Sequence, residues 1–219
     1  MTYCDFALID STSRETRRQH LPSDLDLAAI LRSGYSPFGP GSFVRRDASG
    51  TIAAWDETLS RVPDFDHSLR MATLGLIVRV PRVLASFRVH EDSTSFAAPR
   101  REVTEEAIRV VARFYATPAL PSEIVAMKPH ALAMAHITAA QGHFRARRWG
   151  RGLLCCARAA RLHPRVLANS FVYRLVLSGL IGQHVHRWRS RRLARRAAVP
   201  ASSSNATKTG GAPTVRSAK

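Results

Sequence analysis

The sequence has few cysteines, no acidic side chain after Glu123 and no long apolar run. Only Cys4, Cys155 and Cys156 occur among the 219 residues, and two of them are adjacent, which excludes a disulfide framework and a C-x-x-C metal pair. The adjacent two are interpreted as buried apolar side chains, and a reducing cytosol is the simplest compartment. No stretch reaches the roughly 18 to 20 apolar residues that span a bilayer, and the first ten residues lack a signal-peptide pattern.

Charge is divided unevenly along the chain. Residues 1–99 contain 11 basic and 12 acidic side chains, whereas residues 100–219 contain 22 basic and 4 acidic ones. The first part therefore predicts an ordinary globular surface. The second part predicts contact with an anionic partner, or solubility through charge repulsion.

Residues 1–42 predict a strand, a short helix and a loop. Residues 3–9 alternate between apolar and polar side chains and are rich in β-formers, with Asp5 and Asp10 expected as solvated acids near the strand ends. Residues 25–32 have helical spacing. Residues 36–42 hold two prolines and two glycines, which predicts a loop with fixed bends. Such a loop either holds a ligand or only turns a corner.

Functional signals are densest in residues 62–95. Asp64 and Asp66 stand at the start of a helical pattern, where carboxylates are favoured by the helix dipole. Two strand-like runs follow, at 76–80 and 83–87, and a proline separates them. A polar segment with a histidine comes directly after the second run. A carboxylate at a helix start and a histidine-bearing loop after a strand are components that recur in active sites. On composition alone, a capped helix followed by a solvated loop is the favoured interpretation, and the order of the motifs shifts that balance.

The order of these motifs resembles the C-terminal half of the catalytic domain in family 2 glycosyltransferases, which have the GT-A fold. In that family an acidic pair at a helix start, (E/D)-D-(Y/F/W)-D-L-W-L-R, contains the catalytic base. Residues 63–70 read PDFDHSLR, which matches this motif at five positions: Asp64, Phe65, Asp66, Leu69 and Arg70. An i, i+4 ion pair between Asp66 and Arg70 is expected to orient the helix start.

Three further landmarks occur in the family's order. Residues 87–95 read FRVHEDSTS and are similar to the strand end Y-R-x-H-x-x-S-x-S. Residues 37–46 read PFGPGSFVRR and are similar to the acceptor-side loop with its arginine pair. Residues 54–57 read AWDE and retain part of a G-x-F-D-E turn. The resemblance covers about residues 1–96.

The resemblance implies a site and its chemistry. Asp64 takes the role of the catalytic base, and His90 takes that of a ligand to Mn²⁺ or Mg²⁺, which neutralises the departing diphosphate. Substrate contacts fall on five residues: Gly39, Gly41, Ser42, Arg88 and Ser93. Arg88 either binds the diphosphate through its guanidinium or is a surface arginine at a strand end.

The predicted fold is α/β. Residues 1–99 are expected to form part of a Rossmann-like GT-A domain. The family's nucleotide-binding half, with the D-x-D motif that supplies the other metal ligands, is expected to precede Met1. The residues present are therefore expected to be the C-terminal half of the catalytic domain, truncated and inactive alone.

Residues 100–165 predict an α-helical extension. Helical spacing covers 101–115, a second helix that begins at 123 or 129 and ends at 145, and 149–162. Residues 133–164 have about the length of one tetratricopeptide repeat, a pair of packed helices. A single repeat cannot bury its own apolar face, so this pair is expected to dock on residues 1–99.

Residues 166–196 combine an apolar segment with a basic one. Residues 166–181 are the most apolar of the chain, and residues 184–196 are rich in arginine. This composition predicts an interfacial helix on an anionic membrane surface. The same arginines could instead contact nucleic acid, an alternative that the adjacent apolar segment disfavours. Residues 197–219 lack aromatics and predict a disordered basic tail.

Two functions follow from these patterns. The first is a glycosyltransferase that moves a sugar from a nucleotide-sugar to a hydroxyl acceptor, possibly lipid-linked, in polysaccharide or glycan assembly. Its expected location is the cytoplasmic face of the membrane, as a peripheral protein. The second is a non-catalytic helical adaptor whose basic tail binds a membrane or a nucleic acid.

Overall fold

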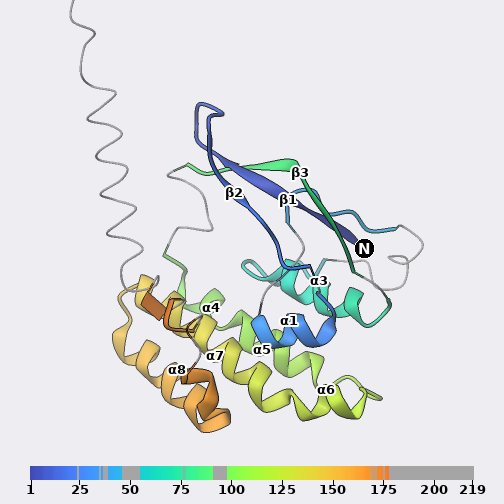
Figure 1. The fold of residues 1–219 in the computed structure, drawn as a ribbon. Helices are drawn as coiled ribbons and strands as arrows, with labels where there is room; N and C mark the ends of the chain where they lie inside the picture. The colour runs from blue at the N-terminus through green and yellow to red at the C-terminus, as the bar shows by residue number, and fades with distance from the viewer. Residues whose placement is uncertain are drawn as a thin grey trace, which may run out of the picture.

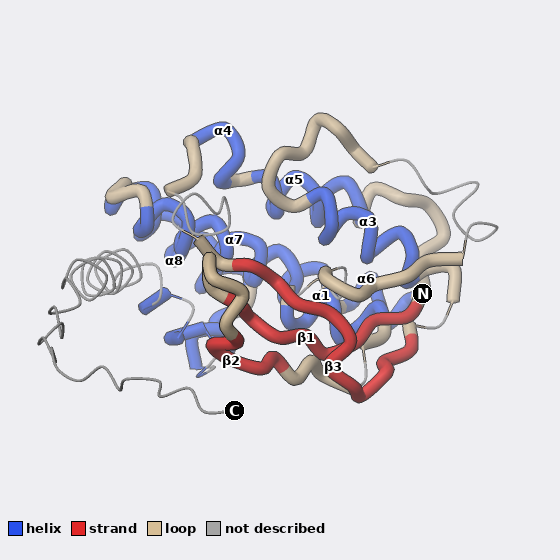
Figure 2. Tube along the Cα trace, turned by 90° about the horizontal axis from the view of Figure 1, so that it is seen from above, coloured by secondary structure: helices blue, strands red, loops and turns tan. Residues whose placement is uncertain are grey.

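The protein combines a small sheet with a layer of helices on one side of it (Figures 1 and 2). The computed structural model describes residues 1–23, 25–34, 36, 39–45, 55–75, 77–90, 98–168, 170, 172–174 and 176–177. Over these residues the chain is a mixture of α and β structure, as the sequence predicts.

The sheet has three strands in the order β2-β1-β3. β1 (Thr2–Ile9) pairs antiparallel with β2 (Glu15–Gln19) and parallel with β3 (Val78–Arg88). The predicted strand over residues 3–9 is therefore confirmed. β2 was not predicted, because its sequence ETRRQ has no apolar alternation and its side chains are mostly exposed.

β3 corrects the prediction of two short strands separated by a proline. Cys4 of β1 pairs with Val80 and Asp5 pairs with Val83, so Pro81 and the residue after it form a bulge within one continuous strand. The bulge accommodates Pro81, which has no N–H to donate, and β3 lies at an edge of the described sheet.

The helices follow the predicted spacing with two differences. They are α1 (Leu27–Ser33), α3 (Pro63–Ala72), α4 (Arg101–Thr104), α5 (Glu106–Phe114), α6 (Ser122–Ala126), α7 (Lys128–Arg145), α8 (Trp149–Leu162) and the 3₁₀ helix η1 (Pro164–Ala168). The single helix predicted over 101–115 is interrupted at Glu105. The helix predicted over 25–32 begins later, because Asp26 caps it by accepting the N–H of Ala29 at 2.6 Å.

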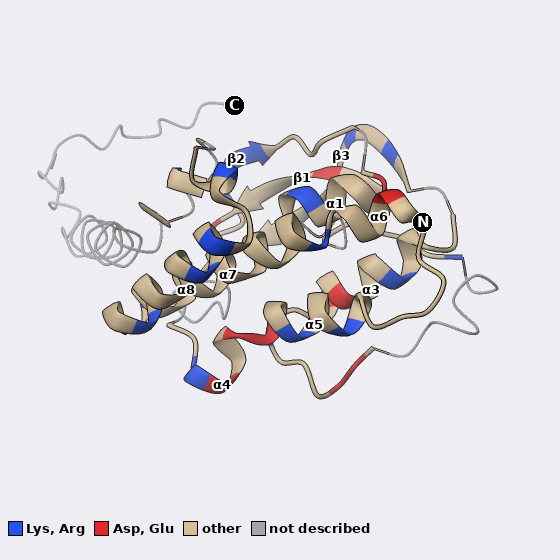
Figure 3. Ribbon diagram, turned by 90° about the horizontal axis from the view of Figure 1, so that it is seen from below, with Lys and Arg blue, Asp and Glu red and all other residues tan. Residues whose placement is uncertain are grey.

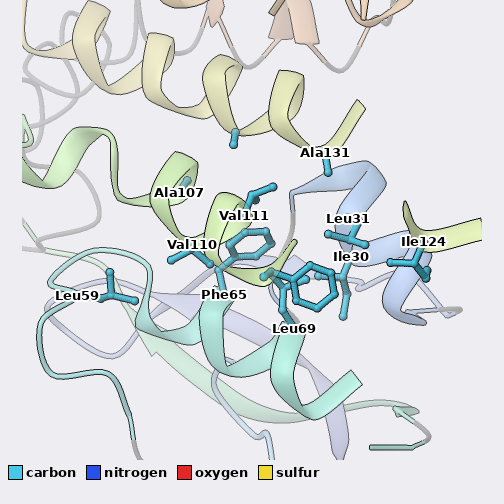
Figure 4. Close-up of a cluster of buried hydrophobic side chains, with 12 residues drawn as sticks. Ile30, Leu31, Leu59, Phe65, Leu69, Ala107, Val110, Val111, Ile124 and Ala131 are labelled. Atoms are coloured by element: carbon cyan, nitrogen blue, oxygen red, sulfur yellow. The ribbon is translucent and has the colours of Figure 1, made fainter. Parts of the chain in front are cut away.

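The largest cluster of buried side chains joins residues on both sides of position 100. Phe65 and Leu69 of α3 pack against Val110 and Val111 of α5, and α1, α6 and α7 complete the cluster (Figure 4). The helical extension therefore shares a core with the helix that contains Asp64. The boundary at 99/100 stays a prediction.

α7 and α8 form the second packed unit of the helical layer. Gly152 of α8 lies against the ring of Phe144 of α7, where a Cβ would come within 2.4 Å of the ring. α7 also supplies side chains to each of the three clusters of buried residues that the described chain forms. Val166 of η1 is buried against α7 and α8, so the predicted interfacial segment 166–196 begins inside the core.

Candidate functional site

The loop before α3 is held by a buried carboxylate from α5. Glu106, whose side chain is 2% exposed, accepts the backbone N–H groups of Ser60, Arg61 and Val62 at 3.1, 2.7 and 3.3 Å. Val62 precedes α3 without a side-chain cap of its own. Glu106 therefore fixes the chain at the point where it enters α3.

The start of α3 places Asp64 in a polar, partly buried position. Its Oδ1 accepts the N–H of Phe65 at 2.9 Å, and its backbone oxygen accepts the Ser68 hydroxyl at 2.8 Å. Burial raises the pKa of the Asp64 carboxyl, and hydrogen bonds from Phe65 and Ser36 oppose part of that rise. Asp64 thus has the environment of a carboxylate whose charged form is disfavoured by desolvation.

Asp64 opens onto a cavity of about 550 Å³ between α1, α3, α5 and α7. Its polar lining comprises Ser36, Ser60, Arg61, Asp64, Arg100 and Thr138, and its other lining residues are apolar or glycine. A concave site of this size with a few convergent polar groups is typical of small-molecule pockets. The described residues therefore provide a partly open, concave space beside the predicted base.

A charge network supports the outer side of α3. Asp66 binds Arg70 at 2.9 Å, which confirms the predicted i, i+4 pair. Asp66 also binds Arg113 of α5 at 2.7 Å, and Arg113 reaches Asp56 at 2.6 Å. The hydroxyl of Thr58 and the guanidinium of Arg113 lower the pKa of Asp56 to about 2. No sequence spacing indicated the role of Arg113, because it lies far along the chain from both acids.

No family model, no curated protein and no solved structure matches the chain.

In the predicted acceptor-side loop, the described residues 39–45 are not part of the cavity lining, and Gly41 packs on the sheet. Gly41 has φ of 76°, and a Cβ at this position would lie 2.2 Å from the sulfur of Cys4. The Ser42 hydroxyl accepts the N–H of Gly39 at 3.0 Å. Gly41 is thus required by backbone conformation and close packing. Substrate contact by Gly39, Gly41 and Ser42 stays a prediction.

Arg88 and His90 lie at the end of β3, and neither lines the cavity. The guanidinium of Arg88 donates to the backbone oxygens of Asp10 and Ser11 at 2.8 and 3.2 Å and to the Ser13 hydroxyl at 3.0 Å. These bonds tie β3 to the turn between β1 and β2, as the strand-end alternative for Arg88 requires. His90 is exposed. The metal role of His90 stays a prediction.

Some predicted features fall outside the described residues. They include Ser93, Pro37, Phe38 and everything from residue 178 onward, which covers the arginine-rich segment and the basic tail. None of the described helices combines the length and apolar character that a membrane crossing needs.

Asp5 corrects the expectation of a solvated strand-end acid. Its side chain is 2% exposed and accepts three hydrogen bonds from Arg79 of β3, at 3.0, 2.9 and 2.7 Å. His20 and the N–H of Leu21 complete its partners. These bonds, with that of Arg79 the strongest, hold the pKa of Asp5 well below its ordinary value. Asp10 is less buried, and its carboxylate accepts N–H groups within the β1–β2 turn.

One group of potential metal ligands occurs among the described residues, at Glu105, His143 and Cys155. Arg148 donates its Nε–H to Nδ1 of His143 at 2.9 Å, so the proton of the neutral imidazole must sit on Nε2. Nε2 faces Glu105 at 3.2 Å and donates to it. No lone pair of His143 remains for a metal ion. Burial also raises the pKa of Cys155, which keeps it as a thiol.

Proposed function

We propose that this chain is the acceptor-side half of an inverting, nucleotide-sugar-dependent glycosyltransferase of the GT-A type. Asp64 acts as its catalytic base. The observation that supports this best is the position of Asp64, at the start of α3 and on the wall of a cavity of about 550 Å³. The motifs around Asp64 support this class of reaction, and the cavity offers a space that an acceptor would fit.

The proposed step needs a carboxylate beside the attacking hydroxyl. In an inverting transfer the acceptor oxygen attacks the sugar carbon as its proton passes to the base and the nucleotide diphosphate leaves. Desolvation raises the pKa of Asp64, which makes its carboxylate a stronger proton acceptor than a solvated one. Phe65 and Ser36 hydrogen-bond to the carboxylate and orient it.

The described residues do not by themselves form the divalent-cation site that the resemblance implies. His90 is exposed and belongs to no group of potential ligands among them. We therefore assign no step to Mn²⁺ or Mg²⁺ here. We propose that metal binding and the nucleotide contacts belong to the D-x-D-bearing half that the resemblance implies.

The test measures sugar transfer from a panel of nucleotide-sugars by two proteins. One is the 219-residue chain, and the other is the product of the reading frame extended upstream of Met1. In the active form, Asp64→Asn should lower turnover by about 10²- to 10⁴-fold with donor binding unchanged. Glu123→Gln, an exposed acid-to-amide change at the start of α6, is the matched control. Turnover of Asp64→Asn equal to that of the control would rule out Asp64 as the base.

We also propose that the helical side of the protein meets an anionic membrane surface. α7 and α8 present lysine and arginine without a single acid (Figure 3), since no acidic residue follows Glu123. Trp149 and Leu153 of α8 are 51% and 63% exposed beside these cations. Exposed apolar side chains interleaved with arginine suit the lipid interface.

A further inference from the structure

The cavity beside Asp64 is lined by both apolar and polar side chains. The apolar side chains of α4, α5 and α7 in this lining are Val103, Ala107, Val111, Ala131 and Ala135. The charged side chains in the same lining are Arg61, Arg100 and Asp64. A ligand that matches this lining has an apolar portion joined to a group that pairs with guanidinium.

Arg61 is the most informative residue of the polar part. Its backbone N–H binds Glu106, but its guanidinium forms no hydrogen bond to any residue in the described ranges. The oxygens of Glu106 are already occupied by three backbone N–H groups. Burial lowers the pKa of Arg61, and the negative charge of Glu106 opposes part of that fall, so the guanidinium is a partly desolvated cation.

A second arginine makes the local charge more positive. Burial lowers the pKa of Arg145 at the end of α7, and repulsion from Arg61 lowers it further. The Glu106 carboxylate already opposes this repulsion at Arg61, and an anion bound at Arg61 would oppose it further. A guanidinium offers paired N–H donors that match the oxygens of a phosphate.

We infer that the cavity between α1, α3, α5 and α7 binds an organic phosphate ester, with the phosphate at Arg61 and an apolar portion against α5 and α7. This assignment of a ligand stands on the cavity and its arginines. Only the further step, that the phosphate ester is the acceptor and presents its hydroxyl to Asp64, rests on the proposed function.

Titration calorimetry on the full chain tests the inference with simple probes. Hexyl phosphate should bind more tightly than inorganic phosphate, which lacks the apolar portion, and more tightly than hexanol, which lacks the anion. Equal binding of hexyl phosphate and inorganic phosphate would overturn the apolar part of the inference. UDP could instead bind more tightly than hexyl phosphate and lose that binding in Arg61→Gln. This result would assign the cavity to the nucleotide and overturn the inference.

Three variants locate the site. Arg61→Gln should weaken hexyl phosphate by about 10- to 100-fold, the usual effect of losing a charge-assisted hydrogen bond. Arg161→Gln removes an exposed arginine of α8 and should leave binding unchanged. Val103→Phe should weaken hexyl phosphate but not inorganic phosphate. Equal losses in Arg61→Gln and Arg161→Gln would indicate nonspecific attraction and overturn the inference.

Asp64→Asn separates this inference from the proposed function. It should keep or strengthen hexyl phosphate binding, because one negative charge leaves the cavity. If hexyl phosphate does not bind the wild-type chain while Asp64→Asn abolishes transfer, the ligand assignment fails and the catalytic proposal stands. If binding follows the expected pattern and Asp64→Asn transfers normally, the catalytic proposal fails instead.

Discussion

The carboxylate of Glu106 accepts the backbone N–H of Arg61 at 2.7 Å, so α5 directly anchors the chain three residues before Asp64. Two neighbouring N–H groups share the same carboxylate. The helical extension therefore does more than cover the sheet layer. It fixes the backbone on which the candidate base and the cavity arginine both stand.

Replacing Glu106 should destabilise the fold strongly. Glu106→Ala leaves three backbone donors without their acceptor, and the free energy of unfolding should fall by about 2–4 kcal/mol. Glu106→Gln keeps one acceptor oxygen and should lose less. Urea unfolding measures both variants, with the exposed Glu123→Ala as control. Equal stability of Glu106→Ala and Glu123→Ala would contradict the anchoring role.

Asp64 should cost stability at neutral pH. Its pKa is raised in the folded state by burial, so folding favours its neutral form. The contribution of Asp64 is most favourable below its unfolded pKa and becomes unfavourable as the pH rises through the folded pKa. Asp64→Asn should therefore raise the urea midpoint at pH 7, and the difference should shrink at pH 3. A lower midpoint for Asp64→Asn at pH 7 would show that the charge stabilises the fold.

A side chain at Gly152 should destabilise the fold, whereas one at Gly150 on the same helix should not. A Cβ at Gly152 would meet the ring of Phe144 at 2.4 Å, whereas nothing lies within 4 Å of one at Gly150. Gly152→Ala should lower the free energy of unfolding by about 1–3 kcal/mol through overpacking. Gly150→Ala should be neutral or stabilise by up to about 1 kcal/mol. Thermal unfolding compares the two, and equal melting temperatures would refute the close contact.

Membrane attachment should depend on lipid charge and salt. The full chain should co-sediment with vesicles that contain anionic lipid, and high salt should weaken this binding because the attraction is screened. Neutral vesicles should retain little protein. Retention by neutral vesicles at high salt would indicate insertion, and a preference for RNA over anionic vesicles would favour the nucleic-acid alternative.

Local patterns predicted local structure, and contacts across the chain were not predictable. β1, α8 and the Asp66–Arg70 pair follow from periodicity and spacing within one element. The bonds from Glu106 to the loop before α3 and from Asp5 to Arg79 join residues more than 40 positions apart. Nothing in a single sequence marks such partners.

The candidate site shows the same division. Asp64 was found because it belongs to a compact motif at a helix start. Arg61 and Arg100 line the same cavity, but each has an ordinary basic sequence context. Arg61 and Arg100 matter to the site only because α5 and α7 complete the lining of the cavity, and that packing is a tertiary property. The strand hidden in residues 15–19 was missed for a similar reason, since its pairing comes from β1.

The central place of α7 has a consequence for how the protein opens. Ala131 and Ala135 belong to the largest cluster, Met134 and Ile137 to the second, and Phe144 to the third. Partial unfolding that detaches α7 exposes all three at once, so the helical layer lacks the independent units of a repeat array. Amide protons along α7 are thus expected to exchange with solvent only through global unfolding, and the loop before α3 is expected to share that protection through its bonds to Glu106 of α5.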